Sequence, residues 1–344
     1  MNNNTDKIQN DLAVLFKNWK GFEPEKVEML PHSGSSRIYF RFSAVEITAL
    51  GVYNQNNNEN IAFISFTEHF LKYKLNVPLI YSIDLSKNIY LIEDLGDIDL
   101  LSWLNKSRNN TSFPETGIEL YKSVLRELIK FQVVAGKDFD YSNCYPFKAF
   151  NKDAIFFDLN YFLDHFVKPG KYSYNQQKLT TDFNSFSDYL LLEENNFFMY
   201  RDFQARNIII KNNQPYFIDY QGGRKGPLQY DLASLLYQAK ATIPEDIRIE
   251  LVDFYLQEVN KALPVKSEKF IEFFNAFSLI RILQTLGAYG LRGLVEGKSH
   301  FIESIVPALS NLALVVVKTD ILNQTPELKD LLKRITANTT KNES

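Results

Sequence analysis

The sequence predicts an α+β protein with two lobes, in which a small antiparallel β-rich lobe containing one helix precedes a larger, mainly helical lobe. Three observations lead to this prediction. Short segments of strand character fill residues 26–93, helical patterns dominate after Gly96, and one β-rich island at 197–220 interrupts the helices. The expected boundaries are a small lobe at 1–95, a larger lobe at 96–325 and a polar tail at 326–344 that frays.

The small lobe begins with a helix that Thr5 can cap and that turns Leu12, Leu15 and Trp19 to one face. In the segment Arg37–Phe42 apolar residues alternate with polar or aromatic ones, which is the period of a half-buried strand. The other expected elements are strands at 26–30, 46–53, 79–83 and 89–93 and a helix at about 60–75. Together they predict one antiparallel sheet with a single inserted helix.

The larger lobe is built from helical patterns that surround the β-rich island. We expect helices near 97–106, 115–135, 153–167, 176–193, 228–240, 244–263, 267–296 and 298–317. The aromatic residues of the third of these helices are predicted to pack in the core rather than to form a platform for a sugar.

Composition excludes several classes of protein. Apolar residues make up 45% of the 344-residue chain and charged residues 23%, with a net charge of −3, so we expect neither disorder nor a nucleic-acid partner. The single cysteine, Cys144, suits a reducing compartment. The N-terminus lacks a signal-peptide pattern, and the apolar run Leu312–Val317 is too short for a membrane helix. We therefore expect a cytoplasmic protein without a membrane partner, whose oligomeric state stays open.

The most informative stretch holds three polar residues at fixed spacing around a predicted hairpin. Asp202 is followed five positions later by Asn207 and an apolar strand, and a second apolar strand ends in Asp219. Phosphoryl transfer needs such groups, because divalent metal must hold the phosphates and Mg²⁺ takes one or two oxygen ligands from protein. The spacing favours Asn207 and Asp219 as metal ligands, and Asp202 as the group that orients and deprotonates the attacking hydroxyl.

These segments resemble the catalytic loop and metal-binding segment of the aminoglycoside phosphotransferase and choline kinase superfamily, relatives of the protein kinases. The family usually has His where this sequence has Tyr200. The resemblance implies a bilobal protein-kinase-like fold that binds ATP and Mg²⁺, with nucleotide on the small lobe and a small-molecule hydroxyl acceptor on the larger one. It also implies that Asp231, within a matching segment, opens a helix and braces the catalytic loop.

Three further segments resemble bacterial kinases that phosphorylate the anomeric hydroxyl of N-acetylmuramic acid and N-acetylglucosamine. They are Gly34–Arg41 in the nucleotide loop, Leu91–Asp97 at the hinge and Arg281–Gly287 on a late helix. The resemblance spans roughly residues 30–315. It implies an amino-sugar acceptor and a role in cell-wall recycling.

The binding residues that follow from this resemblance fall into two groups. The nucleotide is expected at Ser33, Gly34, Ser35, Ser36 and Arg37, and at the hinge residues Glu93, Asp94 and Leu95, which would act through their backbone. The substrate is expected at Arg224, Arg281 and Gln284.

The sequence departs from the kinase pattern at the phosphate anchor, because strand 46–53 has no lysine. Arg37, Arg41 or His32 is expected to replace it. Glu59 could pair with such a basic residue, although a solvated helix surface is the favoured prediction for it. Two alternatives stay open. One is a kinase for another acceptor, such as an aminoglycoside, choline, homoserine or a nucleoside. The other is a pseudokinase that binds nucleotide without turnover.

Overall fold

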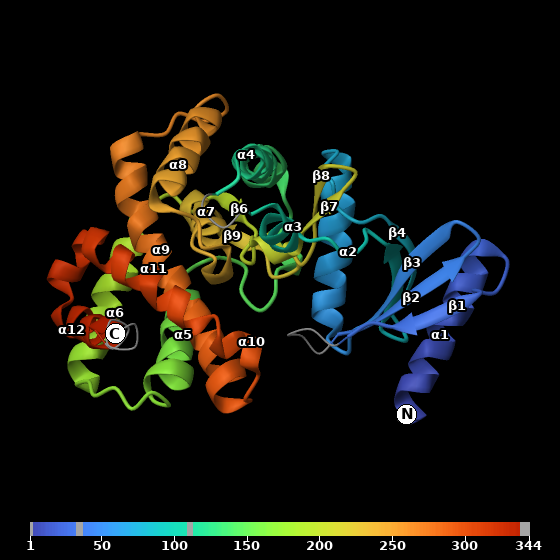
Figure 1. Cartoon of the computed structure of the whole chain (residues 1–344), viewed down its shortest axis with the longest axis horizontal. Helices are drawn as coiled ribbons and strands as arrows, with labels where there is room; N and C mark the ends of the chain where they lie inside the picture. Colours follow the sequence, from blue (N-terminus) through green and yellow to red (C-terminus); the bar gives the residue numbers. More distant parts are fainter. Residues whose placement is uncertain (1–2, 32–36, 109–112, 338–344) are drawn as a thin grey trace.

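The fold, a computed structural model, consists of two lobes at opposite ends of an elongated molecule (Figure 1). The structure describes residues 3–31, 37–108 and 113–337. The small lobe carries the N-terminal sheet, and the larger lobe is mainly helical, as the sequence predicts.

The small lobe contains one five-stranded antiparallel sheet in the order β1-β2-β3-β5-β4. Helix α1 packs Leu12 and Phe16 against Phe40 and Phe42 on one face of the sheet, and α2 is the helix inserted between β3 and β4. The elements are α1 (Asn3–Lys20), β1 (Lys26–Met29), β2 (Ile38–Ala44), β3 (Ile47–Tyr53), α2 (Asn57–Lys72), β4 (Ile80–Asp84) and β5 (Ile89–Glu93).

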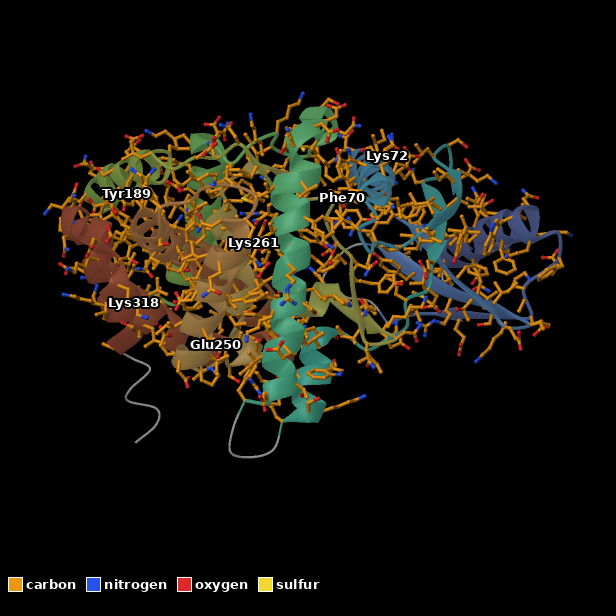
Figure 2. The ribbon with its side chains drawn as sticks, turned by 90° about the horizontal axis from the view of Figure 1, so that it is seen from above. Phe70, Lys72, Tyr189, Glu250, Lys261 and Lys318 are labelled. Carbon is orange, nitrogen blue, oxygen red and sulfur yellow. The ribbon has the colours of Figure 1, made fainter. Side chains whose placement is uncertain are left out.

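Helix α2 connects the two lobes. Its N-terminus is capped by Asn56, whose side chain accepts the Glu59 N–H at 3.4 Å. Its buried face carries Phe63 and Phe70, and the Phe70 ring lies 4.7 Å from that of Phe131, just beyond α4, in the larger lobe. Figure 2 shows Phe70 beside α4, whereas Tyr189, Glu250, Lys261 and Lys318 lie beyond α4 on the larger lobe. Helix α2 therefore fixes the small lobe to the catalytic one.

The larger lobe surrounds the buried helix α9, which packs against α5, α7 and α11. The β-rich island appears as two small antiparallel pairs, β6 with β9 and β7 with β8. The elements are α3 (Leu100–Ser107), α4 (Glu115–Ile129), α5 (Lys152–Phe162), α6 (Gln176–Leu190), β6 (Phe197–Met199), β7 (Ile208–Lys211), β8 (Gln214–Phe217), β9 (Arg224–Gly226), α7 (Leu228–Leu236), α8 (Glu245–Val259), α9 (Ser267–Tyr289), α10 (Ser299–Ile302), α11 (Ile305–Lys318) and α12 (Pro326–Ala337).

The expectation of a frayed polar tail from residue 326 is wrong for 326–337, which form helix α12. Its buried residues are Leu328, Leu331, Leu332 and Ile335, a spacing of three, four and seven that marks one apolar helix face. The carboxylate of Asp182 also accepts the Leu328 N–H at 2.9 Å. The lysines between these residues made the segment look polar, although its apolar side belongs to the core.

One helical stretch, Ser299–Lys318, is long and apolar enough to cross a membrane by length and composition, with a mean hydropathy of 1.7. The stretch is longer than the uninterrupted apolar run Leu312–Val317, because it continues through Glu303 and other polar residues. It is divided between α10 and α11, and 33% of it is buried. A single such stretch is weak evidence for a membrane span, since core helices have the same length and composition.

Candidate active site

A cleft of about 630 Å³ lies where the two lobes meet. The small lobe lines it from β2, β3, β5 and the segment that follows β5, and the larger lobe from the β7–β8 hairpin and α9. Of the residues predicted to act in the site, those that line the cleft are Arg37, Glu93, Leu95, Asp202, Asn207, Asp219, Arg281 and Gln284. The residues predicted to bind nucleotide, metal and acceptor and the predicted catalytic residue therefore line one cleft.

The three predicted chemical residues come together at the β7–β8 hairpin. Asp202 lies in the loop after β6, Asn207 ends a 3₁₀ turn before β7, and Asp219 follows β8. The Asn207 amide nitrogen donates to the Asp202 carbonyl oxygen at 2.9 Å and to Asp219 Oδ2 at 3.4 Å. The Ile218 N–H donates to the Asn207 carbonyl oxygen at 3.0 Å, which joins the two segments that carry the predicted metal ligands.

The donor set at this point suits Mg²⁺. Both side-chain contacts of Asn207 use its nitrogen, which leaves its oxygen for a cation beside the Asp219 carboxylate. Mg²⁺ is commonly held by one or two protein oxygens together with substrate phosphates. Within the described residues no group of three or more His, Cys, Asp or Glu could hold a metal, so a site here depends on the nucleotide for its remaining ligands.

Two residues at the catalytic hairpin have left-handed backbone, Arg201 at φ 81° and Asp219 at φ 69°. Such conformations cost about 1–3 kcal/mol for residues other than glycine and persist where the surroundings hold them. The guanidinium of Arg201 is held by the buried carboxylate of Asp158, at 2.7 and 2.5 Å, and by the hydroxyl of Tyr230. These contacts keep the Asp202 side chain turned into the cleft.

Asp231 braces the catalytic loop from beneath. Its fully buried carboxylate accepts the N–H groups of Tyr200 and Arg201, at 2.7 and 2.9 Å, and the Gln132 amide at 3.2 Å. Burial raises the pKa of Asp231 to about 7, although these hydrogen bonds act in the opposite direction. The geometry matches the bracing role that the resemblance implies.

Tyr200, which stands where the superfamily usually has His, is also a structural link. Its hydroxyl donates to the Ile218 carbonyl oxygen at 2.6 Å, and burial raises its pKa, so it remains a donor. It thereby joins the loop that carries Asp202 to the strand that ends at Asp219.

Arg37 lies at the entrance to β2 and reaches across the cleft. Its guanidinium donates to Asp219 Oδ1 at 2.9 Å and to Glu59 Oε2 at 2.7 Å. Burial lowers the pKa of Arg37, but the carboxylate of Asp219 and other neighbours raise it overall. The favoured prediction of a solvated surface is wrong for Glu59, and the alternative that it pairs with a basic residue is confirmed by its contact with Arg37. Ser33, Gly34, Ser35, Ser36 and His32 lie outside the described residues.

Arg41, the other candidate for the phosphate anchor, instead supports the hinge. Its guanidinium binds the Asp94 carboxylate at 2.7 and 3.1 Å and the Asp97 carboxylate at 2.7 and 3.0 Å. Lys211 on the hairpin donates to Glu93 Oε1 at 2.7 Å. The side chains of Glu93 and Asp94 therefore hold neighbouring parts of the fold, and the binding of a nucleotide base by the hinge backbone stays a prediction.

Apolar residues enclose the space beside the hinge. They come from the small lobe above and from the hairpin below, and they are Leu30, Leu50, Ile92, Leu95, Ile209 and Ile218. A flat aromatic base fits between such walls, and hinge backbone groups fix its orientation.

Two of the three predicted substrate residues lie in the cleft. Arg281 on α9 donates to Ser234 Oγ at 2.9 Å and approaches Asp202 Oδ1 at 3.4 Å, and Gln284 is its hydrogen-bond partner one turn later. Arg224 is not brought to the cleft. It is buried on β9, where it donates to the Gly222 carbonyl oxygen at 3.2 and 3.1 Å, and burial with the nearby Arg201 lowers its pKa to about 10.

The cleft continues past Asp202 to an end that the sequence reasoning did not identify. The residues there are Gln204, Arg206, Gln238, Lys240, Tyr289 and Phe301. Sequence signals for two of them existed. Arg206 directly precedes the metal-binding Asn207, and Tyr289 lies eight positions after Arg281 on the same face of α9.

The chain is similar in sequence to known phosphotransferases. Residues 155–265 match the phosphotransferase enzyme family. Two curated relatives are N-acetylmuramate/N-acetylglucosamine kinases. The one from Neisseria meningitidis is 24% identical over 63% of this chain and 63% of its own length, so that alignment spans less than two thirds of the relative. The one from Pseudomonas aeruginosa is 23% identical over 90% of this chain and 88% of its own length.

Solved structures share the fold across nearly the whole chain. Choline kinase from Cryptosporidium parvum superposes with a TM-score of 0.61 at 14% identity, covering 95% of this chain and 99% of the other. An amicoumacin kinase solved with AMP-PNP and Ca²⁺ gives a TM-score of 0.60 at 11% identity, over 94% and 97% of the two chains. Residues 155–265 are therefore similar to the phosphotransferase enzyme family, and the chain has the fold of aminoglycoside phosphotransferases and choline kinase.

Proposed function

We propose that this kinase transfers the γ-phosphoryl group of ATP to the anomeric hydroxyl of an N-acetylated amino sugar, N-acetylmuramate or N-acetylglucosamine, in cell-wall recycling. The observation that carries the proposal is the convergence of Asp202, Asn207 and Asp219 in one cleft with a hinge and an acceptor end. The names of the curated relatives support the choice of acceptor.

In this proposal Asp202 positions the sugar hydroxyl and takes its proton. Its side chain is 41% exposed, so an acceptor can reach it, and Arg281 at 3.4 Å limits its rotation. A Mg²⁺ held by Asn207 and Asp219 would neutralise charge on the phosphates. Proximity and orientation then supply most of the rate, since phosphoryl transfer needs little covalent chemistry from the protein.

Arg37 is proposed as the anchor for the nucleotide phosphates in place of the usual lysine. Its pairing with Glu59 on α2 parallels the lysine–glutamate pair of protein kinases, in which the glutamate also comes from the helix of the small lobe. The guanidinium also contacts Asp219, so phosphate, arginine and metal site are coupled. A planar guanidinium can bind two phosphate oxygens at once.

The far end of the cleft suits a sugar. The rings of Tyr289 and Phe301 lie 6.0 Å apart at an angle of 49°, and the amide side chains of Gln204, Gln238 and Gln284 line the same cleft. Aromatic surface with a few convergent polar groups is the usual lining of a small-molecule site. Amides can pair with hydroxyl and acetamido groups, which donate and accept hydrogen bonds.

Cationic acceptors such as choline or aminoglycosides fit the described lining less well. Its acidic residues are Glu93, Asp202 and Asp219, and each already faces a basic side chain, Lys211, Arg281 and Arg37 respectively. A pseudokinase is also disfavoured, because the complete catalytic set is retained. A cytoplasmic location belongs to the proposal, since it goes with a requirement for ATP and a single thiol.

The test is ATP consumption in Mg²⁺ buffer with N-acetylglucosamine, N-acetylmuramate, kanamycin, choline and homoserine, and with Asp202→Asn as the inactive control. Turnover of an N-acetylated sugar that the substitution abolishes is the expected result. Turnover of a different acceptor alone would remove the amino-sugar assignment and keep the mechanism. Nucleotide binding without any turnover would favour the pseudokinase.

A further inference from the structure

We propose that the preferred acceptor carries a carboxylate, which Arg206 and Lys240 recognise at the end of the cleft beyond Asp202. The inference rests on the proposed function and sharpens it. Among amino sugars, it selects one with an acidic ether side chain, as in N-acetylmuramate, over N-acetylglucosamine.

The two cations lie on neighbouring walls of the cleft. Arg206 belongs to the 3₁₀ turn between Asp202 and Asn207, and Lys240 lies in the turn that follows α7. Within the described part of the chain, the guanidinium of Arg206 is exposed and has no hydrogen-bond or ion-pair partner. A solvated guanidinium loses little hydration energy when it binds a ligand, and its planar donors can form two hydrogen bonds with a carboxylate.

Lys240 has one ionic partner but can still bind a ligand carboxylate. It contacts Glu303 at 2.9 Å, and the Glu303 side chain is 64% exposed. A pair with one solvent-exposed partner contributes little to stability, so a ligand carboxylate can replace or share the contact. The contact also shows where Lys240 lies, next to α10, which carries Phe301.

The charge lining this end of the cleft is unbalanced in favour of positive groups. The carboxylate of Asp202 faces Arg281, and that of Asp219 faces Arg37. Burial lowers the pKa of His300, and the positive charges of Arg206, Lys240 and Lys298 lower it further. These three charges therefore act together beside His300. An anionic ligand is therefore favoured at this end.

The anion is assigned to the acceptor rather than to ATP for a geometric reason. The residue facing the metal-binding Asp219 from the small lobe is Arg37, which is already placed for the nucleotide phosphates. Arg206 and Lys240 instead line the cleft together with Tyr289 and Phe301, since the charge of Arg206 acts on Tyr289 and the charges of both cations act on His300, whose ring contacts that of Phe301. A sugar whose anomeric hydroxyl meets Asp202 would extend its substituents toward them.

The experiment compares kcat/KM for N-acetylmuramate and N-acetylglucosamine in the full-length protein, Arg206→Gln, Lys240→Gln and the remote surface control Lys137→Gln. We expect the original protein to prefer N-acetylmuramate and Arg206→Gln to lower that preference by about 10- to 100-fold, the usual worth of a charge-assisted hydrogen bond. Lys240→Gln should act in the same direction, and Arg206→Lys should restore part of the preference. Lys137→Gln should change nothing.

Equal losses for both sugars, or a higher KM for ATP in Arg206→Gln, would overturn the inference and assign Arg206 to the phosphates. Equal use of the two sugars by the original protein, unchanged by Arg206→Gln, would overturn it while leaving the proposed function intact. Failure of both sugars as acceptors would overturn the proposed function itself, and the inference with it. Circular dichroism of each variant verifies that the fold is retained.

Discussion

The loop that carries Asp202 is held in a different way from Arg37, the proposed phosphate anchor, although the loop contacts Asp219 through Asn207 and Arg37 contacts it directly. The loop is fixed within one lobe, where buried Asp231 accepts two of its N–H groups and Arg201 is held by Asp158. The anchor depends on both lobes, because Arg37 is joined to Glu59 on α2 and to Asp219 on the larger lobe. The loop is thus set by local folding, and the anchor by the closure of the two lobes.

This difference has a functional consequence. A change within the loop should affect chemistry while leaving nucleotide affinity nearly unaltered, because its bracing contacts do not cross the cleft. A change in the anchor should affect nucleotide binding and chemistry together, since Arg37 contacts a metal ligand. The following predictions test that separation, beginning with the largest effect.

Asp202→Asn should lower kcat by about 10²- to 10⁴-fold, because the general base is removed while the side-chain volume is kept. The Kd for ATP, measured by calorimetry in Mg²⁺ buffer, should change by less than about threefold, since Asp202 is not an anchor for the nucleotide. A large loss of ATP affinity in this variant would show that loop and anchor are not separate.

Arg37→Ala should raise the KM for ATP and lower kcat/KM by about 10- to 100-fold, which corresponds to the loss of charge-assisted hydrogen bonds. Arg37→Lys is the matched variant and should recover part of the loss, because a lysine restores the charge without the second donor. If Arg37→Ala binds ATP like the original protein, Arg37 is not the phosphate anchor.

Asp231→Asn should lower kcat by about tenfold through a misplaced loop and should also alter the pH dependence of stability. The folded pKa of about 7 lies above the unfolded value of 3.8, so the protonated form stabilises the fold at low pH. That contribution is lost as pH rises from about 4 to about 7, and between pH 5 and 8 it amounts to about 3 kcal/mol.

Urea unfolding of the two proteins across this pH range measures the difference. The original protein should lose more stability between pH 5 and 8 than Asp231→Asn does. The exposed Asp253→Asn is the control, and it should keep the original pH slope. Identical slopes for Asp231→Asn and the original protein would contradict the raised pKa.

Glu59→Gln should have the smallest effect, a rise of less than about tenfold in the KM for ATP. The neutral amide can still accept a hydrogen bond from Arg37 but no longer offsets its charge. Since the Glu59 side chain is 35% exposed, solvent screening limits the loss. An effect larger than that of Arg37→Ala would mean that Glu59 acts independently of the arginine.

The sequence predicted the parts of the site that are close together along the chain. The spacing of Asp202, Asn207 and Asp219 around one hairpin was sufficient, because a hairpin brings its two ends to the same place. The apolar runs likewise predicted the five strands of the small lobe. These features depend on local pattern.

Features that depend on long-range packing were harder to predict. Glu59 looked like helix surface, because its partner Arg37 meets it only once α2 packs on the sheet. Arg224 follows the metal-binding Asp219 closely in sequence, yet the pairing of β9 with β6 turns it away from the cleft. Helix α12 was misjudged from its charge, although its apolar spacing was visible in the sequence.

The most direct test of the central claim is the position of the phosphate in the product. The protein is incubated with ATP, Mg²⁺ and N-acetylmuramate labelled with ¹³C at the anomeric carbon, and the carbon spectrum is recorded. Transfer to the anomeric hydroxyl predicts that phosphorus splits the labelled signal and that Asp202→Asn gives no such product. A phosphorylated sugar whose anomeric carbon shows no coupling, or no phosphorylated amino sugar at all, would contradict the account.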